Sequence, residues 1–362
     1  MASVSSKTNR ADINHIINAL EKRHFFKLVC GASLTDVQMV ENLSFVFALA
    51  GAHVIDLAPT ADVIFAAKKG IERALRVQPS LLKPIPMASI QLDKDPHFRK
   101  VEVDYNLCDV CGVCVKACPT EAFKVERKDK SENRKQFIYS LERCFGCGAC
   151  PSYCHTSALK MLDTKPTPKE TLEEMIALGI TVIEFHFGEN IYNLELVLNE
   201  IKDLVNKLDL ISFSIGSELL SDENIKAAAY LCYRLAGEGI ILQCDGIPMS
   251  GGGEKIYRNM KNGNNVGKDA STMDSKCLHV ANIIQKENLP VYLQISGGTN
   301  QDSFSRAIEL GININGVAIG SYARKQLMPY LDDLNDENKL QNAVRIAKDL
   351  VQSVGLNQEV EK

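Results

Sequence analysis

The sequence predicts an α/β protein: a (βα)8 barrel of the TIM type, with a small α+β domain inserted after the third strand. Two observations lead to this fold class. Eight short apolar segments alternate with helical patterns along most of the 362-residue chain. Two cysteine-rich runs, "CDVCGVCVKACP" and "CFGCGACPSYCH", then separate the third apolar segment from its helix. The cysteines therefore lie in a loop on the carboxyl face of the barrel, where such barrels keep their active sites.

The eight expected strands are short apolar segments, each followed by a stretch with a helical pattern. They cover residues 25–33, 52–58, 84–90, 181–188, 209–217, 240–246, 290–298 and 315–321. The helix belonging to the third strand comes only at 167–179, after the cysteine-rich segment. The expected divisions are a tail with a short amphipathic helix, three barrel units, the insert, the remaining units and a C-terminal tail: 1–22, 23–100, 101–160, 161–355 and 356–362.

The composition is that of an ordinary globular protein, with 45% hydrophobic and 24% charged residues. A net charge of −4 gives no electrostatic basis for binding nucleic acid or an anionic membrane. No stretch approaches the ~20 apolar residues of a transmembrane helix, and the N-terminus lacks the apolar core of a secretory signal. We therefore expect a soluble, cytoplasmic protein. In that reducing compartment, clustered cysteines are more often metal ligands or redox groups than disulfides.

Eight of the twelve cysteines fall in the two runs, which share the spacing C-x2-C-x2-C-x3-C. Three thiolates two residues apart on a tight loop can reach three irons of one cubane cluster, while the fourth cysteine ligates the other cluster. A zinc site would need only four ligands in total. The sequence therefore predicts two [4Fe–4S] clusters. The first is held by Cys108, Cys111, Cys114 and Cys154, and the second by Cys144, Cys147, Cys150 and Cys118.

The insert resembles the bacterial two-cluster ferredoxin domain over residues 101–160, including "CPTEAF" after the first run. Cys154 is followed by His155 rather than proline, which puts the turn at this fourth ligand in question. The charged segment 124–137 between the runs is expected to be a solvated hairpin. The remaining cysteines are expected to be core residues, because a free cysteine packs like a small hydrophobe. They are Cys30, Cys232, Cys244 and Cys277.

Alternation along the expected strands places one set of polar residues inside the barrel, because the apolar set must face the helices. This set contains Lys27, Asp56, Glu184, His186, Gln243, Asp245 and Gln294. Buried charges of this number need partners. One interpretation is a catalytic or ligand pocket with Lys27 and His186 as acid–base candidates. The other is a mutually satisfied polar plug, and the sequence leaves both open.

Glycines follow the last two expected strands, where barrels often bind phosphate through backbone amides. The candidates for such a site, suited to a flavin or another phosphate-bearing ligand, are Gly297, Gly298, Gly320, Ser321 and Arg324. The alternative is that these glycines only form tight turns. Residues 250–253 and 261–269 make a long loop after the sixth strand, which is interpreted as a lid or a mobile segment.

From about residue 15 to 352, the chain resembles the light-dependent period protein family of cyanobacteria. The resemblance rests on the "HFFKLVCGAS" start, the barrel, the two-cluster insert and the "ISGGTN…VAIGSYAR" ending. It implies iron–sulfur clusters and a role in passing light or redox information to the circadian clock through clock-input proteins. It implies no catalytic residues.

Two main hypotheses of function follow. The first is an iron–sulfur redox sensor that signals to the clock through protein partners and exchanges electrons with a donor such as a quinone or ferredoxin pool. The second is an iron–sulfur oxidoreductase that uses a flavin or phosphate-bearing ligand at the barrel mouth. A simple electron carrier is the weakest hypothesis, because it leaves the barrel unexplained. The sequence does not decide whether the chain is an enzyme.

Overall fold

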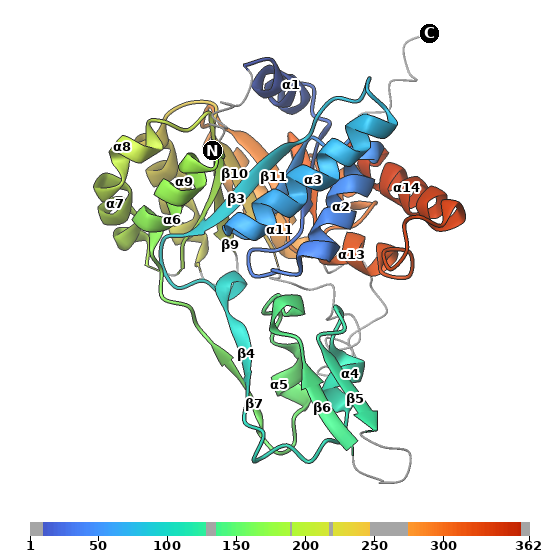
Figure 1. The fold of residues 1–362 in the computed structure, drawn as a ribbon. Coiled ribbons are helices and arrows are strands. Elements are labelled where there is room, and N and C mark those ends of the chain that lie inside the picture. Colours follow the sequence, from blue (N-terminus) through green and yellow to red (C-terminus); the bar gives the residue numbers. More distant parts are fainter. Residues whose placement is uncertain (1–9, 128–134, 189, 217–219, 247–273, 356–362) are drawn as a thin grey trace.

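The computed structural model describes residues 10–127, 135–188, 190–216, 220–246 and 274–355. Eight parallel strands close into a barrel in chain order, so the predicted barrel is confirmed (Figure 1). The strands are β1 (Phe25–Val29), β2 (Val54–Leu57), β3 (Ile85–Gln91), β8 (Val182–His186), β9 (Leu210–Gly216), β10 (Ile241–Asp245), β11 (Tyr292–Ser296) and β12 (Gly316–Ile319). Seven of the eight lie within the predicted segments, and β3 runs one residue beyond its predicted end.

Helices surround the barrel and return the chain between successive strands (Figure 1). Side-chain oxygens satisfy the first backbone N–H groups of several of them; Asp36, for example, accepts from the Met39 N–H at 3.0 Å. No helix in the described part of the chain is long and apolar enough to cross a membrane. The helices are α2 (Val37–Ala50), α3 (Ala61–Val77), α6 (Pro168–Ala177), α7 (Ile191–Glu200), α8 (Lys202–Val205), α9 (Asp222–Ala236), α11 (Ser275–Gln285), α12 (Ser303–Glu309), α13 (Ser321–Leu327) and α14 (Glu337–Gln352).

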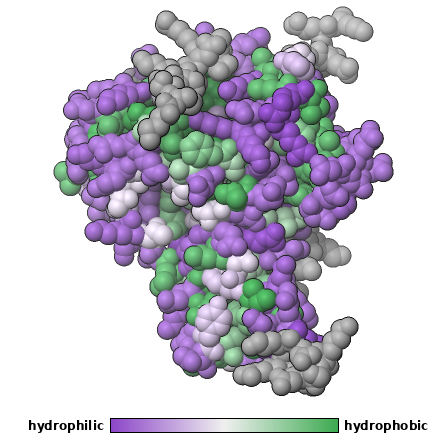
Figure 2. All heavy atoms as spheres, in the orientation of Figure 1, coloured by the Kyte–Doolittle hydropathy of each residue, from purple (hydrophilic) through white to green (hydrophobic). Residues whose placement is uncertain are grey.

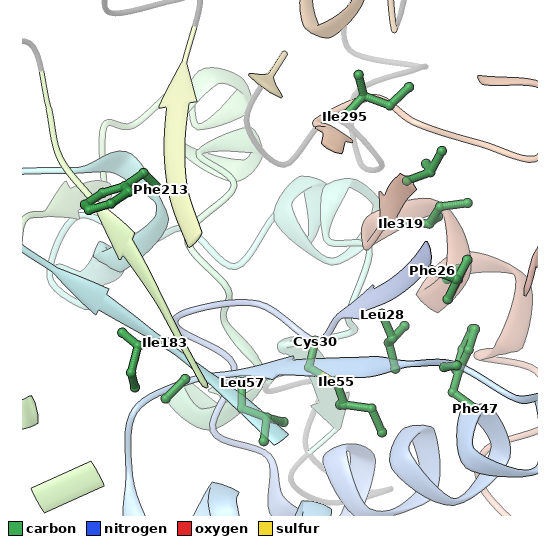
Figure 3. Close-up of a cluster of buried hydrophobic side chains, with 14 of the residues drawn as sticks. Phe26, Leu28, Cys30, Phe47, Ile55, Leu57, Ile183, Phe213, Ile295 and Ile319 are labelled. Atoms are coloured by element: carbon green, nitrogen blue, oxygen red, sulfur yellow. The ribbon is translucent and has the colours of Figure 1, made fainter. Parts of the chain in front are cut away.

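The main core lies between the barrel and its helices. Outward-facing strand residues such as Leu28, Ile55 and Phe213 are fully buried there (Figure 3). The Phe26 ring stacks on Phe47 of α2 with centroids 5.8 Å apart. The four cysteines outside the two runs are buried in this same core, as predicted. Burial of this apolar set fixes which side of each strand faces inward.

The amino-terminal end of the barrel has its own apolar cluster, closed by α1 (Arg10–Glu21). Ile16 and Leu20 of this helix pack against inward-facing strand residues such as Val54 and Val182. Helix α1 lies at the opposite end of the barrel from the cysteine insert (Figure 1). One end of the barrel interior is therefore apolar and sealed, and the polar inward-facing residues lie toward the other end.

His53 lies buried at this sealed end. Its Nδ1 accepts a hydrogen bond from the Phe26 N–H at 3.1 Å, and its ring stacks on His15. Burial lowers the pKa of His53 to about 3, and the nearby His15 and His24 act in the same direction. A histidine in the unfolded chain titrates near pH 6.5. As the pH falls below that value, His53 takes up a proton in the unfolded chain but not in the folded protein, so acid favours unfolding.

We therefore expect the free energy of unfolding to fall between pH 7.5 and 5.5, and His53→Gln to reduce that fall by about 1 kcal/mol. Urea unfolding followed by circular dichroism at the two pH values measures the difference. His279→Gln, an exposed histidine on α11, serves as the control. An equal pH dependence in the wild type and His53→Gln would show that His53 does not contribute.

The insert leaves and rejoins the barrel through two antiparallel strands, β4 (Lys100–Val103) and β7 (Leu159–Leu162). It extends from the carboxyl end of the barrel strands (Figure 1). Between these strands lie two short helices, an antiparallel strand pair and a single 3-10 turn before the second run. They are α4 (Val113–Ala117), β5 (Phe123–Arg127), β6 (Lys135–Tyr139), η2 (Leu141–Arg143) and α5 (Ala149–Tyr153). The β5–β6 pair is the predicted hairpin; residues 128–134 at its tip lie outside the described residues.

The second half of the insert is attached to the barrel by hydrogen bonds. The Thr35 N–H donates to the Glu142 carbonyl at 2.9 Å, and Arg143 Nε donates to Asp36 Oδ2 at 3.0 Å. Figure 2 shows hydrophilic side chains over most of the barrel on this face, with more hydrophobic surface on the insert below it. The two hydrogen bonds hold the second cysteine run against the barrel.

Candidate functional site

One cysteine of the first run joins three of the second. Cys118 lines a small pocket together with Cys144, Cys147 and Cys150. Cys144 and Cys150 are buried in the apolar core of the insert. The structure thus brings together the four residues of the expected second cluster.

The first three cysteines of the other expected set are also neighbours. Cys108 and Cys111 lie close enough to Cys114 to add to the effect of burial, which raises the pKa of Cys114 to about 11. Cys154 packs against the same insert core as Cys114. The Cys154 Sγ is 3.5 Å from the hydroxyl of Thr156, two residues on.

The two fourth cysteines have matching surroundings, although proline follows one and histidine follows the other. Cys118 Sγ is 3.6 Å from the Thr120 hydroxyl, which matches the arrangement of Cys154 and Thr156. The Ala122 N–H also donates to Cys118 Sγ at 3.3 Å. His155 points instead to Asp109, with Nε2 3.0 Å from Oδ2. His155 therefore does not disturb the contact of Cys154 with Thr156, which matches that of Cys118 with Thr120.

Both cysteine loops turn through left-handed backbone conformations. In the first run Val110 and Gly112 have φ of 60° and 76°, and the equivalent positions in the second run are Gly146 and Gly148 with φ of 78° and 71°. Gly146 also approaches the backbone, because a Cβ there would lie 2.3 Å from the Arg99 carbonyl oxygen. Sulfur donors on curled loops, with backbone N–H groups close by, fit an iron–sulfur cluster.

Phe145, between the first two cysteines of the second run, reaches the barrel. The guanidinium carbon of Arg324 lies 4.6 Å from the centroid of its ring. Arg324 is buried and donates from Nη1 to the carbonyls of Val29 and Cys30, both at 2.6 Å. Arg324, predicted as a phosphate-binding charge, thus also joins the end of β1 to the cysteine loop.

A cavity of about 120 Å³ opens at the carboxyl end of the barrel. Phe145 of the insert forms part of its wall. Ten of the residues predicted for the barrel interior and mouth line it: Asp56, Glu184, His186, Gln243, Asp245, Gly297, Gly298, Gly320, Ser321 and Arg324. Lys27 and Gln294, the other two, are fully buried in the barrel interior and do not line this cavity.

Lys27 belongs to a buried polar network. It forms an ion pair with Glu184 Oε2, which also accepts from the Ser212 hydroxyl at 2.9 Å. Gln243 Nε2 donates to Glu184 Oε1 at 2.8 Å, and Gln294 Nε2 donates to Gln243 Oε1 at 2.7 Å. Burial alone would raise the pKa of Glu184, but Lys27 and neighbouring His186 hold it well below its usual range. This deeper layer matches the polar-plug interpretation.

Asp56 sits at the boundary between this network and the cavity. The Ser89 hydroxyl donates to Asp56 Oδ1 at 2.8 Å. Burial, reinforced by the charge of Glu184, raises the pKa of Asp56 to about 6. This shift brings the pKa of Asp56 toward neutral pH, as is common for groups in functional sites.

Sequence analysis missed Asp95 and His97, which follow β3 in the segment "DKDPHF". His97 Nδ1 lies 2.6 Å from Asp95 Oδ1, and its Nε2 lies 3.8 Å from Asp245 Oδ2. Burial alone would lower the pKa of His97, but Asp95 outweighs it and raises the value to about 9. The position of Asp95 and His97 in the sequence could have indicated their role, because polar residues directly after a barrel strand face the mouth of the barrel.

His186 is 3% exposed and projects into the same cavity. Its Nε2 lies 3.2 Å from Glu184 Oε1 and its Nδ1 lies 3.9 Å from Asp95 Oδ2. Neither ring nitrogen has a well-aligned hydrogen bond. The ring is held by neighbouring rings, with centroid distances of 5.2 Å to His97 and 5.4 Å to Phe98. This imidazole, like Gln294 Oε1 in the network below it, therefore keeps hydrogen-bonding capacity that no well-aligned partner uses.

The glycines after β11 serve packing as well as lining the cavity. A Cβ on Gly297 would lie 2.4 Å from Asp245 Oδ1, and its φ is +76°. The Thr299 hydroxyl donates to the Ala318 carbonyl and so joins this loop to β12. The tight-turn interpretation therefore accounts for Gly297. The loop residues 250–253 and 261–269 lie outside the described residues.

Comparison with known proteins adds two family matches. Residues 175–360 match the family described as light dependent period A C-terminal domain, and residues 107–158 match the 4Fe-4S dicluster domain. The second match confirms the predicted iron–sulfur domain. The protein named "Light dependent period A" from Synechococcus elongatus is 28% identical over 339 residues, which cover 89% of this chain and 86% of that relative.

Two solved structures follow a course of the chain with weak similarity to this one. The YdjI aldolase from Escherichia coli K12 aligns with a TM-score of 0.44 at 9% identity, over 95% of this chain and 94% of that one. A tryptophan synthase from M. tuberculosis aligns with a TM-score of 0.43 at 8% identity, over 95% and 98% of the two chains.

Proposed function

Because the chain belongs to the light dependent period A family, we propose that it is an iron–sulfur redox sensor that informs the circadian clock of light and redox state through clock-input protein partners. Its electron donor is a quinone or ferredoxin pool. The observation that supports a sensor most directly is the Phe145–Arg324 contact, which joins the second cysteine loop to the barrel mouth. A carrier that only passed electrons would not need this connection.

The proposed ligand sets are those expected from the spacing. Cys108, Cys111, Cys114 and Cys154 hold one cluster, and Cys144, Cys147, Cys150 and Cys118 hold the other. The shared pocket of the last four supports the second set. Bound there, a [4Fe–4S] cluster supplies reversible one-electron transfer.

Arg324 is the residue that communicates between the two parts. Burial lowers the pKa of Arg324, and Cys30 and then Cys147 of the second cysteine loop act in the opposite direction, so the guanidinium lies within electrostatic reach of that loop. The same guanidinium holds the Val29 and Cys30 carbonyls at the end of β1. A change of charge at the second cysteine loop therefore changes the electrostatic force on Arg324 and, through it, on the end of β1. Signalling requires that the barrel mouth has a different conformation in each redox state and that the two conformations differ in their affinity for a partner.

Hydrogen–deuterium exchange of the oxidised and dithionite-reduced protein tests this proposal. We expect reduction to change exchange by at least about twofold at 296–300 and 320–325, because all of these residues except Ala323 line the cavity beside Phe145. Phe145→Leu removes the aromatic contact with Arg324 and should abolish that change.

Phe137→Leu is the matched control, since Phe137 packs on Phe123 within the insert. It should keep the redox-dependent exchange. Iron content, measured on each sample, shows that the variants hold their clusters. Identical exchange in the two redox states of the wild type, with iron retained, would contradict a sensor that acts through the barrel mouth.

The second candidate function is an iron–sulfur oxidoreductase with a flavin or phosphate-bearing ligand in the cavity. It is favoured by one observation: buried His186 has no well-aligned hydrogen bond at either ring nitrogen and lines the same cavity as Asp56 and the Gly297–Gly298 turn. An absorption spectrum of protein purified without oxygen, before and after dithionite, separates the candidates. Structured flavin bands would support the enzyme, and a broad band that bleaches on its own would favour the sensor.

A further inference from the structure

We propose that His97, His186 and Asp95 bind one divalent transition-metal ion, of the zinc or ferrous class, at the mouth of the barrel. This site is separate from the eight cysteines of the two runs. Its residues come from two places in the fold: the loop after β3 supplies Asp95 and His97, and the end of β8 supplies His186. The ligands would thus meet only because β3 and β8 are neighbours in the barrel.

The distances fit donors around one ion. The candidate ligand atoms of the three residues lie within 4.8 Å of one another. Two donors that share a zinc ion at bonds of about 2.1 Å lie at most ~4.2 Å apart. Asp95 Oδ2 and His186 Nδ1 are 3.9 Å apart, which already satisfies this limit. A set of donors spread over as much as 4.8 Å must come closer together by side-chain rotation to share the ion.

The surroundings are suited to a cation. Asp245 Oδ2 lies 3.8 Å from His97 Nε2, and Glu184 Oε1 lies 3.2 Å from His186 Nε2, so carboxylates approach both imidazoles. Asp95 Oδ1 lies 2.6 Å from His97 Nδ1, so these two donor atoms are already within the separation that two ligands of one ion can have. Two imidazoles and a carboxylate are a donor set that zinc and ferrous iron favour.

A purely structural histidine cluster does not account for His186. Its ring is almost fully buried, and neither nitrogen has a well-aligned hydrogen bond, although Nε2 lies 3.2 Å from Glu184 Oε1. An unsatisfied buried nitrogen carries a free-energy cost, and a metal ion bound to Nδ1 would remove it there. Three protein ligands leave further coordination positions directed to the cavity, as in sites that bind a substrate or small ligand rather than structural sites.

Zinc retention tests the proposal on the full chain with its clusters loaded, kept without oxygen. Protein is treated with a chelator, incubated with Zn²⁺ and freed of excess metal, and zinc and iron are counted in the same sample. We expect about one zinc per chain in the wild type. His97→Gln and His186→Gln should each reduce zinc affinity at least about tenfold, with iron unchanged. Zinc is the stringent probe because it binds such sites more tightly than ferrous iron.

His279→Gln is the matched control, because His279 forms an exposed pair with Asp222 at 2.9 Å. It should retain zinc like the wild type. Equal zinc retention in all variants would overturn the proposal, as would a wild type that retains none. If the two variants fail to fold, the wild type still decides: Zn²⁺ must raise its melting temperature without displacing iron, and no shift would overturn the proposal.

Discussion

Lys27→Met should destabilise the barrel by about 3–5 kcal/mol, because it leaves the Glu184 carboxylate buried without its cationic partner. Lys27 is fully buried, and the pair lies in the middle of the barrel interior. Methionine is unbranched like lysine and only one heavy atom shorter, so most of the loss comes from the charge rather than from a cavity. Urea unfolding followed by far-ultraviolet circular dichroism measures the change in the free energy of unfolding.

Two variants define the origin of this effect. Lys27→Met/Glu184→Gln removes both charges and should recover much of the loss, because neutral partners are less costly to bury. Lys69→Met breaks the 2.8 Å pair with Glu41, in which the Lys69 side chain is 68% exposed, and should change stability by less than about 1 kcal/mol. A stability of Lys27→Met close to that of Lys69→Met would show that the buried pair does not hold the barrel together.

Gly146→Ala should remove about half of the iron, because one of the two clusters is lost. Its φ of +78° is unfavourable for alanine, and the new Cβ would lie 2.3 Å from the Arg99 carbonyl oxygen. That atom belongs to the backbone before β4, so the second cysteine loop must move instead. Iron and acid-labile sulfide per chain measure the loss. Cys118→Ser should lose the same share, since Cys118 shares the pocket with Cys144, Cys147 and Cys150.

Gly112→Ala is the control for backbone strain. Gly112 has a φ of +76° in the first run, but the nearest atom to a new Cβ is Val125 Cγ2 at 3.8 Å. This variant should keep its iron, and Val110 with φ of 60° already shows that this loop accepts a side chain in a left-handed conformation. Equal iron loss in Gly112→Ala and Gly146→Ala would assign the effect to strain alone and contradict the role of the Arg99 contact.

The barrel and the content of its interior were predictable because they depend on local alternation. Period-two patterning showed that Asp56, Glu184 and Asp245 would face inward, since the apolar set must meet the helices. Identical spacing in two runs predicted the iron–sulfur domain, because ligand spacing is a property of a single loop. In both cases the information lies within a few consecutive residues.

The tertiary structure decided which inward residues meet each other and which stay open to the cavity. Lys27 pairs with Glu184 across the barrel, whereas His186 approaches Asp95 and His97 of another loop. The contact of Phe145 with Arg324 joins positions 179 residues apart, as their numbers show. Such pairings depend on how the barrel closes and where the insert rests against it. Local sequence patterns cannot predict these pairings, because the pairings form only when distant segments pack together.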